Sequence, residues 1–140
     1  MIPVLLARAL RTAGLRWKPV SGDRFMIDES EVGEEVFTVS DMTVEAHSYP
    51  SGTVLGFNGT TEWALDSVSL DDALWLPNEG QLRTLLRGAF RSLRVHEESG
   101  STVYTVAIDF RGEAGEYRGE SAEEAYGEAL LHVVGAATLA

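Results

Sequence analysis

Apolar residues at helical spacing open the chain. Pro3 suits the first position of a helix, and Gly14 is a natural stop signal after it. The apolar positions between them share one helical face: Leu6, Ala9, Leu10 and Ala13. The pattern therefore predicts an N-terminal helix that ends at Gly14.

After residue 16 the hydrophobic period changes from helical spacing to alternation. Short runs rich in β-branched and aromatic residues follow one another, separated by turn signals such as "SYPSGT" and "NGT". These runs are residues 24–27, 35–42, 43–49, 53–58 and 62–68. Short strands joined by tight turns predict an antiparallel β-meander.

The C-terminal half returns to helical spacing and then alternates again. Asn78 and Gln81 have the spacing of a capping box, and a leucine stripe carries the predicted second helix to Phe90. Three strands are predicted over residues 92–98, 102–110 and 115–120, and Ser121 caps a third helix with Glu124 at the capping-box position. The fold class is α+β: helix, antiparallel meander, then helix, three strands and helix. We expect a single domain over residues 1–140, with a meander part (1–75) and an α-β-β-β-α part (76–140).

The composition narrows the function classes. The chain has 140 residues, no cysteine and a formal net charge of −11. Residues 1–75 hold five basic and twelve acidic groups (−7), and residues 76–140 hold six and ten (−4). A field of this sign repels nucleic acid and anionic membranes and suits a basic protein partner. We expect a cytoplasmic protein that binds neither bulk nucleic acid nor a membrane.

The most distinctive stretch is "GFNGTTEWALDS", residues 56–67. Asn-Gly is a strong hairpin signal, so a hairpin with a core tryptophan is the favoured interpretation. The alternative is a partner or ligand surface with Trp63 beside Trp75, to which Glu62, Asp66 and Asp41 would also belong. The carboxylates of Glu62 and Asp66 would lie about 13 Å apart on one strand, too far to share a proton.

Other polar residues have weaker patterns. Asp41 is interpreted as a turn residue, with a buried acid as the alternative. The three histidines, which fall in different predicted elements, are His47, His96 and His132. Four arginines recur at helical spacing, as a solvated helix face or a phosphate-binding comb: Arg83, Arg87, Arg91 and Arg94. No phosphate loop or catalytic triad can be recognised, and we assign no catalytic, cofactor-binding or metal-ligating residue.

Three resemblances to known families follow from longer stretches. Residues 79–136 resemble the double-stranded-RNA-binding fold in element order, with Ser121, Glu123 and Glu124 where that family places lysines. "GESAEEAYGEALLHVV" looks like the last helix of that fold. The last strands and the helix with its acidic "EEA" are also similar to HicB-type antitoxins, which place such a helix after a small sheet. "GDRF", "VFTVSDM", "GFNGTTEWALDSV" and "LWLP" look like short bacterial proteins often labelled as pilus assembly proteins. This last resemblance implies a bacterial single-domain family and no mechanism.

The sequence thus favours a non-catalytic protein-binding or regulatory module without a cofactor. Two other hypotheses stay open. One is a small-substrate enzyme with a pocket near Trp63 and Trp75, and the other is an antitoxin-like or RNA-related module in the C-terminal half. The oligomeric state is left open.

Overall fold

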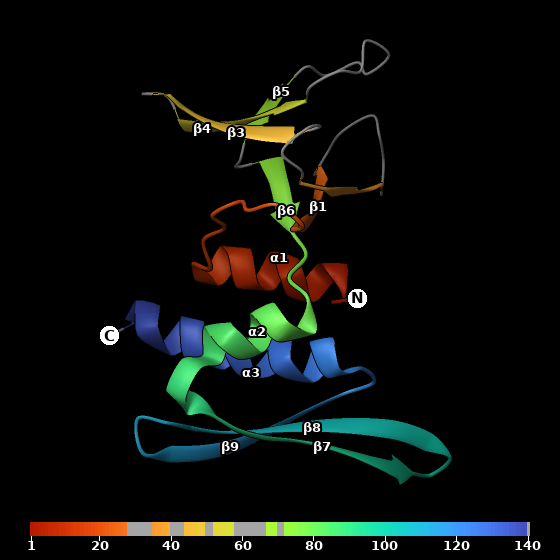
Figure 1. The fold of residues 1–140 in the computed structure, drawn as a ribbon. Coiled ribbons are helices and arrows are strands. Elements are labelled where there is room, and N and C mark those ends of the chain that lie inside the picture. Colours follow the sequence, from red (N-terminus) through yellow and green to blue (C-terminus); the bar gives the residue numbers. More distant parts are fainter. Residues whose placement is uncertain (28–34, 40–43, 50–51, 58–66, 70–71, 140) are drawn as a thin grey trace. The chain divides into compact units, whose positions relative to one another are not determined.

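The structure is a computed structural model that describes residues 1–27, 35–39, 44–49, 52–57, 67–69 and 72–139 (Figure 1). It is an α+β fold, as predicted, with the expected order of helix, antiparallel strands, helix, three strands and helix. The chain divides into two compact units. One unit combines residues 1–16 with residues 77–140, and the other is formed by residues 17–76.

The N-terminal helix α1 (Val4–Ala13) belongs to the unit that contains the C-terminal half. Gly14 ends it in a left-handed conformation (φ 115°), and the Leu15 amide donates back to the Leu10 carbonyl at 2.9 Å. Its buried residues face α3 (Ala122–Leu139), where Gly127 allows close contact. The predicted division into residues 1–75 and 76–140 grouped this helix with the meander, whereas the structure groups it with the C-terminal half.

Helix α2 (Glu79–Leu86) begins with the predicted capping box. The Gln81 amide donates to Asn78 Oδ1 at 2.8 Å, and the Asn78 amide donates to Gln81 Oε1 at 2.9 Å. The helix ends at Leu86, four residues before the predicted end, and a 3-10 turn η2 (Arg87–Ala89) follows. The leucine stripe suggested a longer helix, but Phe90 already pairs in a sheet.

The four arginines therefore do not form a comb on one helix. Arg83 lies on α2, Arg87 on η2, and Arg91 and Arg94 on strand β7 (Phe90–Glu98). The idea of a phosphate-binding helix face is wrong for this reason.

A three-stranded antiparallel sheet completes this unit, in the order β7–β8 (Ser101–Phe110)–β9 (Glu113–Gly119). Helices α2 and α3 lie along one side of it (Figure 1). Ring contacts of Phe90 with Tyr126 and of Tyr117 with His132 show which face α3 covers. Because side chains alternate along strands, the neighbouring positions belong to the opposite face, which we call the outer face.

The outer face has a clear register. Arg94, Thr105 and Arg118 lie side by side across the three strands, and Ala107 lies opposite Glu116 in the next row. The register shifts between Phe90 and Ser92, so Arg91 is the extra residue of a β-bulge.

The unit formed by residues 17–76 contains two three-stranded antiparallel sheets. The first has the order β2 (Val36–Thr38)–β1 (Arg24–Ile27)–β6 (Ala73–Trp75), and the second is a meander of β3 (Val44–Tyr49), β4 (Gly52–Phe57) and β5 (Ser67–Ser69). Strand β6 was not expected from the sequence. Around β1, the buried residues Phe25, Ile27, Val39 and Ala73 form a small core.

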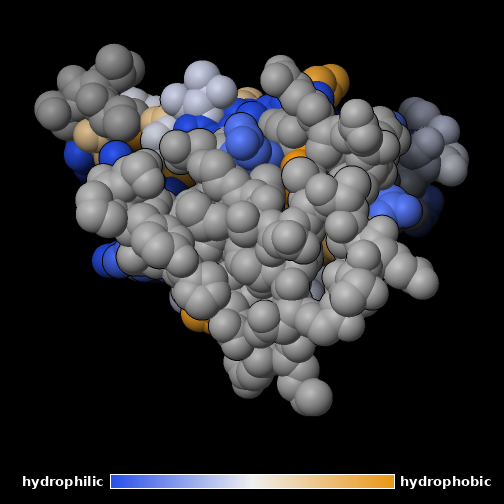
Figure 2. Space-filling view, turned by 90° about the horizontal axis from the view of Figure 1, so that it is seen from above, coloured by the Kyte–Doolittle hydropathy of each residue, from blue (hydrophilic) through white to orange (hydrophobic). Residues whose placement is uncertain are grey.

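In the view of Figure 2 the described residues are visible only in places, and both hydrophilic and hydrophobic ones are seen there. Among the described residues, the exposed large hydrophobic ones are Met1, Leu5, Val20, Val36 and Val95; Leu5, Val36 and Val95 lie on α1, β2 and β7, and the other two lie outside helices and strands. Single exposed hydrophobic residues are normal on a protein surface.

Candidate functional site

The predicted tryptophan surface is largely outside the described residues. Asp41, Glu62, Trp63 and Asp66 all lie outside the described residues, and of the predicted surface only Trp75 is described. Trp75 itself is half-buried on β6.

Trp75 stacks on Trp17, with ring centroids 6.4 Å apart and the planes 11° from parallel. The Trp17 indole N–H donates to Asp23 Oδ2 at 2.8 Å, and the amide of Val20 donates to the same oxygen at 3.1 Å. The indole nitrogen of Trp75 is buried and has no acceptor among the described residues. Trp75 is thus part of the packing around β1.

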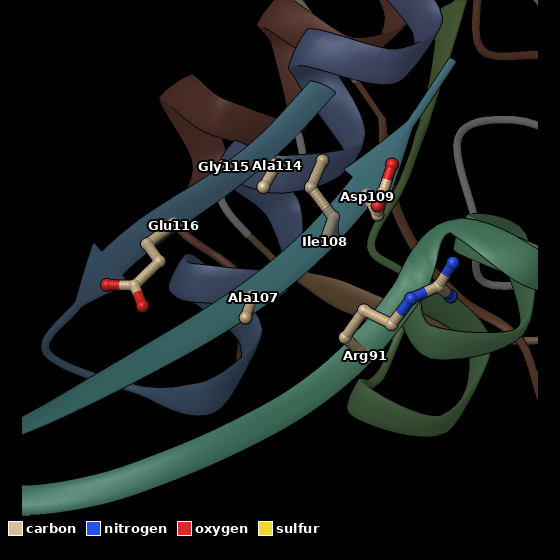
Figure 3. A pocket seen from close by; sticks show the side chains of 7 residues that line it. All are labelled: Arg91, Ala107, Ile108, Asp109, Ala114, Gly115 and Glu116. Carbon is tan, nitrogen blue, oxygen red and sulfur yellow. The ribbon is translucent and has the colours of Figure 1, made fainter. Parts of the chain in front are cut away.

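A depression of about 410 Å³ lies on the sheet β7–β8–β9 (Figure 3). Three strands contribute to it: Arg91 from β7, then Ala107, Ile108 and Asp109 from β8, and Ala114, Gly115 and Glu116 from β9. In Figure 3 Glu116 and Arg91 reach out on opposite sides of Ala107. Ala107, Ala114 and Gly115 have small side chains or none, so space remains between the charged side chains of the depression.

Ion pairs hold the side chains next to the depression. Arg94 Nη2 donates to Glu116 Oε1 at 2.8 Å across the central strand, and Arg118 pairs with Glu98. Both arginine side chains are more than half exposed, yet Thr105 between them is only 3% exposed. The arginine stems therefore cover the central strand, while their charged groups remain in water.

The charged groups in the depression differ in how they are bound. Arg91 Nη1 donates to the carbonyls of Gly88 at 2.5 Å and Phe90 at 3.1 Å. Glu116 shares one carboxylate oxygen with Arg94. The half-buried Asp109 carboxylate has no hydrogen-bond or ion-pair partner among the described residues. Asp109 is thus the carboxylate in the depression that no described residue binds.

The groups with a shifted pKa lie elsewhere. Burial raises the pKa of Tyr117, and the nearby Glu113 carboxylate raises it further. Burial also raises the pKa of Tyr126, with smaller opposing effects of Arg83 and Glu79. Tyr117 and Tyr126 take part in the contacts between the sheet and α3, and neither lines the depression.

The described part of the chain contains no group of three or more histidine and carboxylate side chains placed to hold a metal ion. His96 lies 3.3 Å from Glu98 on the sheet, and His132 lies against Tyr117. No helix within the described ranges is long and apolar enough to cross a bilayer.

Sequence reasoning missed the depression. It treated Arg91 as a helical residue and singled out none of Ala107, Asp109 or Glu116. Alternation along residues 102–110 and 115–120 did show which residues share a face. The bulge that brings Arg91 to this position has no sequence signature.

Comparisons with known proteins add no family to this description. No protein-family model, no curated protein and no solved structure matches the chain.

Proposed function

We propose that the chain is a non-catalytic binding module that holds a protein partner on the outer face of the sheet β7–β8–β9. The observation that carries this proposal is the depression on that face. An exposed sheet face with a hollow of about 410 Å³ at three strands offers a partner both area and a place for a side chain.

The ion pairs around the depression support the proposal. The side chains of these pairs are about half exposed or more, so a partner that covers the face can reach their charged groups. The formal charge of −11 favours a basic partner over nucleic acid.

Affinity capture with a matched pair of variants tests the proposal. Ala107→Phe fills the depression, while Ala137→Phe places the same side chain at an exposed position on α3. A bacterial protein retained by the wild type and by Ala137→Phe, but lost with Ala107→Phe, is the expected result. If both variants retain the partner equally well, the partner does not bind the outer face.

The other hypotheses remain proposals, as does a cytoplasmic location. The order of α2, β7, β8, β9 and α3 favours the RNA-related or antitoxin-like alternative, since it is the order on which that resemblance rests. Against it, Glu123 and Glu124 in the first turn of α3 would repel a phosphate backbone. A gel shift with double-stranded RNA at physiological salt separates the two hypotheses. Membership among the short bacterial proteins labelled as pilus assembly proteins, and an enzyme pocket at Trp63 and Trp75, likewise remain proposals.

A further inference from the structure

The depression on the outer face has a chemistry of its own, which narrows the kind of partner. We infer that it receives a basic side chain, arginine or lysine, of the protein partner, with the cationic group at Asp109. This inference rests on the proposed function, because it assumes that a partner meets the outer face.

The depression contains a carboxylate that no described residue binds. The Asp109 carboxylate is half-buried and has no partner among the described residues. A carboxylate that is partly removed from water gains most from a charge-assisted hydrogen bond. A guanidinium or ammonium group supplies that bond.

The cationic side chain in the depression, Arg91, already has hydrogen-bond partners. Arg91 donates to two backbone carbonyls, which direct one end of its guanidinium to the 3-10 turn. Because both N–H groups of Nη1 are used, Arg91 has only its other guanidinium N–H groups left to bind an anion. The carboxylate oxygens of Asp109, by contrast, are bound by no described residue and can bind a cation. The net charge of the chain, which lies mainly on residues 17–76, favours the approach of cations over that of anions.

The shape of the depression also suits a basic side chain. Ala107, Ala114 and Gly115 put little bulk into the depression, so an aliphatic stem can lie across them. Arginine and lysine side chains combine such a stem with a charged end. The volume of about 410 Å³ is at the lower end of the range of about 300–1,000 Å³ for small-ligand sites, and a single side chain needs less.

The test is an NMR titration of the full chain, following backbone amide shifts. The probes are N-acetyl-arginine amide and N-acetyl-lysine amide, with neutral N-acetyl-citrulline amide as the control. We expect saturable shifts at residues 107–109 and 114–116 with at least one cationic probe and none with citrulline. The two cationic probes decide between a guanidinium and an ammonium group.

Two variants of equal charge locate the contact. Asp109→Asn and Glu113→Gln each remove one negative charge from the hairpin that joins β8 to β9, but Glu113 does not line the depression. We expect Asp109→Asn to weaken probe binding at least tenfold and Glu113→Gln to leave it within twofold. Equal weakening would mean that only the general field of the protein attracts the probe, and would overturn the inference.

An anionic probe covers the opposite chemistry. Saturable binding of N-acetyl-glutamate amide that Arg91→Gln abolishes would also overturn the inference, because the site would then be an anion site. Failure here is distinct from failure of the proposed function. If Ala107→Phe abolishes partner capture but no cationic probe binds, the partner does bind the outer face. Only the inference that a basic side chain enters the depression would then be wrong. Probe binding without any effect of Ala107→Phe on capture removes the proposed function.

Discussion

Replacing Gly127 with alanine tests how the first helix joins the rest of the fold. A Cβ atom at Gly127 would lie 2.6 Å from Leu6 Cδ2 and 3.4 Å from Ile2 Cδ1. Both neighbours are buried, Leu6 at 7% and Ile2 at 1% exposed, so neither can swing freely into solvent. The methyl group therefore has to push α1 away from α3 or force side chains out of their preferred rotamers.

The magnitude follows from two opposing effects. Within a helix, alanine is better than glycine by about 0.5–1 kcal/mol, because glycine loses more backbone entropy on folding. Overpacking a core costs about 1–3 kcal/mol. For Gly127→Ala we expect the second effect to prevail, with a net destabilisation of about 0.5–2 kcal/mol, or a melting temperature several degrees lower.

Gly135→Ala is the control in the same helix. A Cβ atom there meets nothing within 4 Å, so only the helix-propensity gain of about 0.5–1 kcal/mol remains. Far-UV circular dichroism during urea unfolding measures both variants, since the helices α1, α2 and α3 all belong to the same unit. Equal stabilisation by the two substitutions would show that α1 does not pack on α3 at Gly127.

Three further predictions follow from single contacts. Gly119→Ala should destabilise the fold by about 1–3 kcal/mol in urea unfolding, because its Cβ would lie 2.7 Å from the backbone nitrogen of Ala125, which cannot move aside. Trp17→Phe should lower the free energy of unfolding by about 1–3 kcal/mol, because the buried Asp23 loses the indole N–H donor. Trp75→Phe should lower it less, because the indole N–H of Trp75 has no acceptor among the described residues. The raised pKa of Tyr126 means that the unfolded chain loses this proton at lower pH than the native one. The stabilisation is thus present below the unfolded pKa of about 10 and is lost as pH rises through the folded value; urea unfolding at alkaline pH should show a smaller loss for Tyr126→Phe.

Local signals in the sequence predicted the helix boundaries that depend on local chemistry. The capping box at Asn78 and the stop at Gly14 both act within a few residues, and both are found in the structure. The turn predicted within "ESGST" is also present, with Ser99 and Gly100 both at positive φ between β7 and β8. Such features need no knowledge of distant parts of the chain.

The features that the sequence did not reveal depend on distant partners. Strand β6 has only three residues, too few to show a period, and exists because it pairs with β1 far back in the chain. The end of α2 is set by the pairing of Phe90 with Ile108, which overrides the helical spacing of the apolar residues. For the same reason the depression could not be predicted, since a bulge and three strands create it together.

The division of the chain into units also separates two kinds of electrostatic effect. Residues 17–76 hold two of the 11 basic residues and twelve of the 22 acidic ones, so this unit has a formal charge of −10 and the other unit the remaining −1. Long-range attraction of a basic partner would therefore come mainly from residues 17–76, whereas the depression lies in the nearly neutral unit. Charges outside a contact act mostly on the association rate and its salt dependence, while a charge within the contact acts on dissociation. In the proposed complex, salt should thus slow association even in Asp109→Asn, while that substitution itself should speed dissociation.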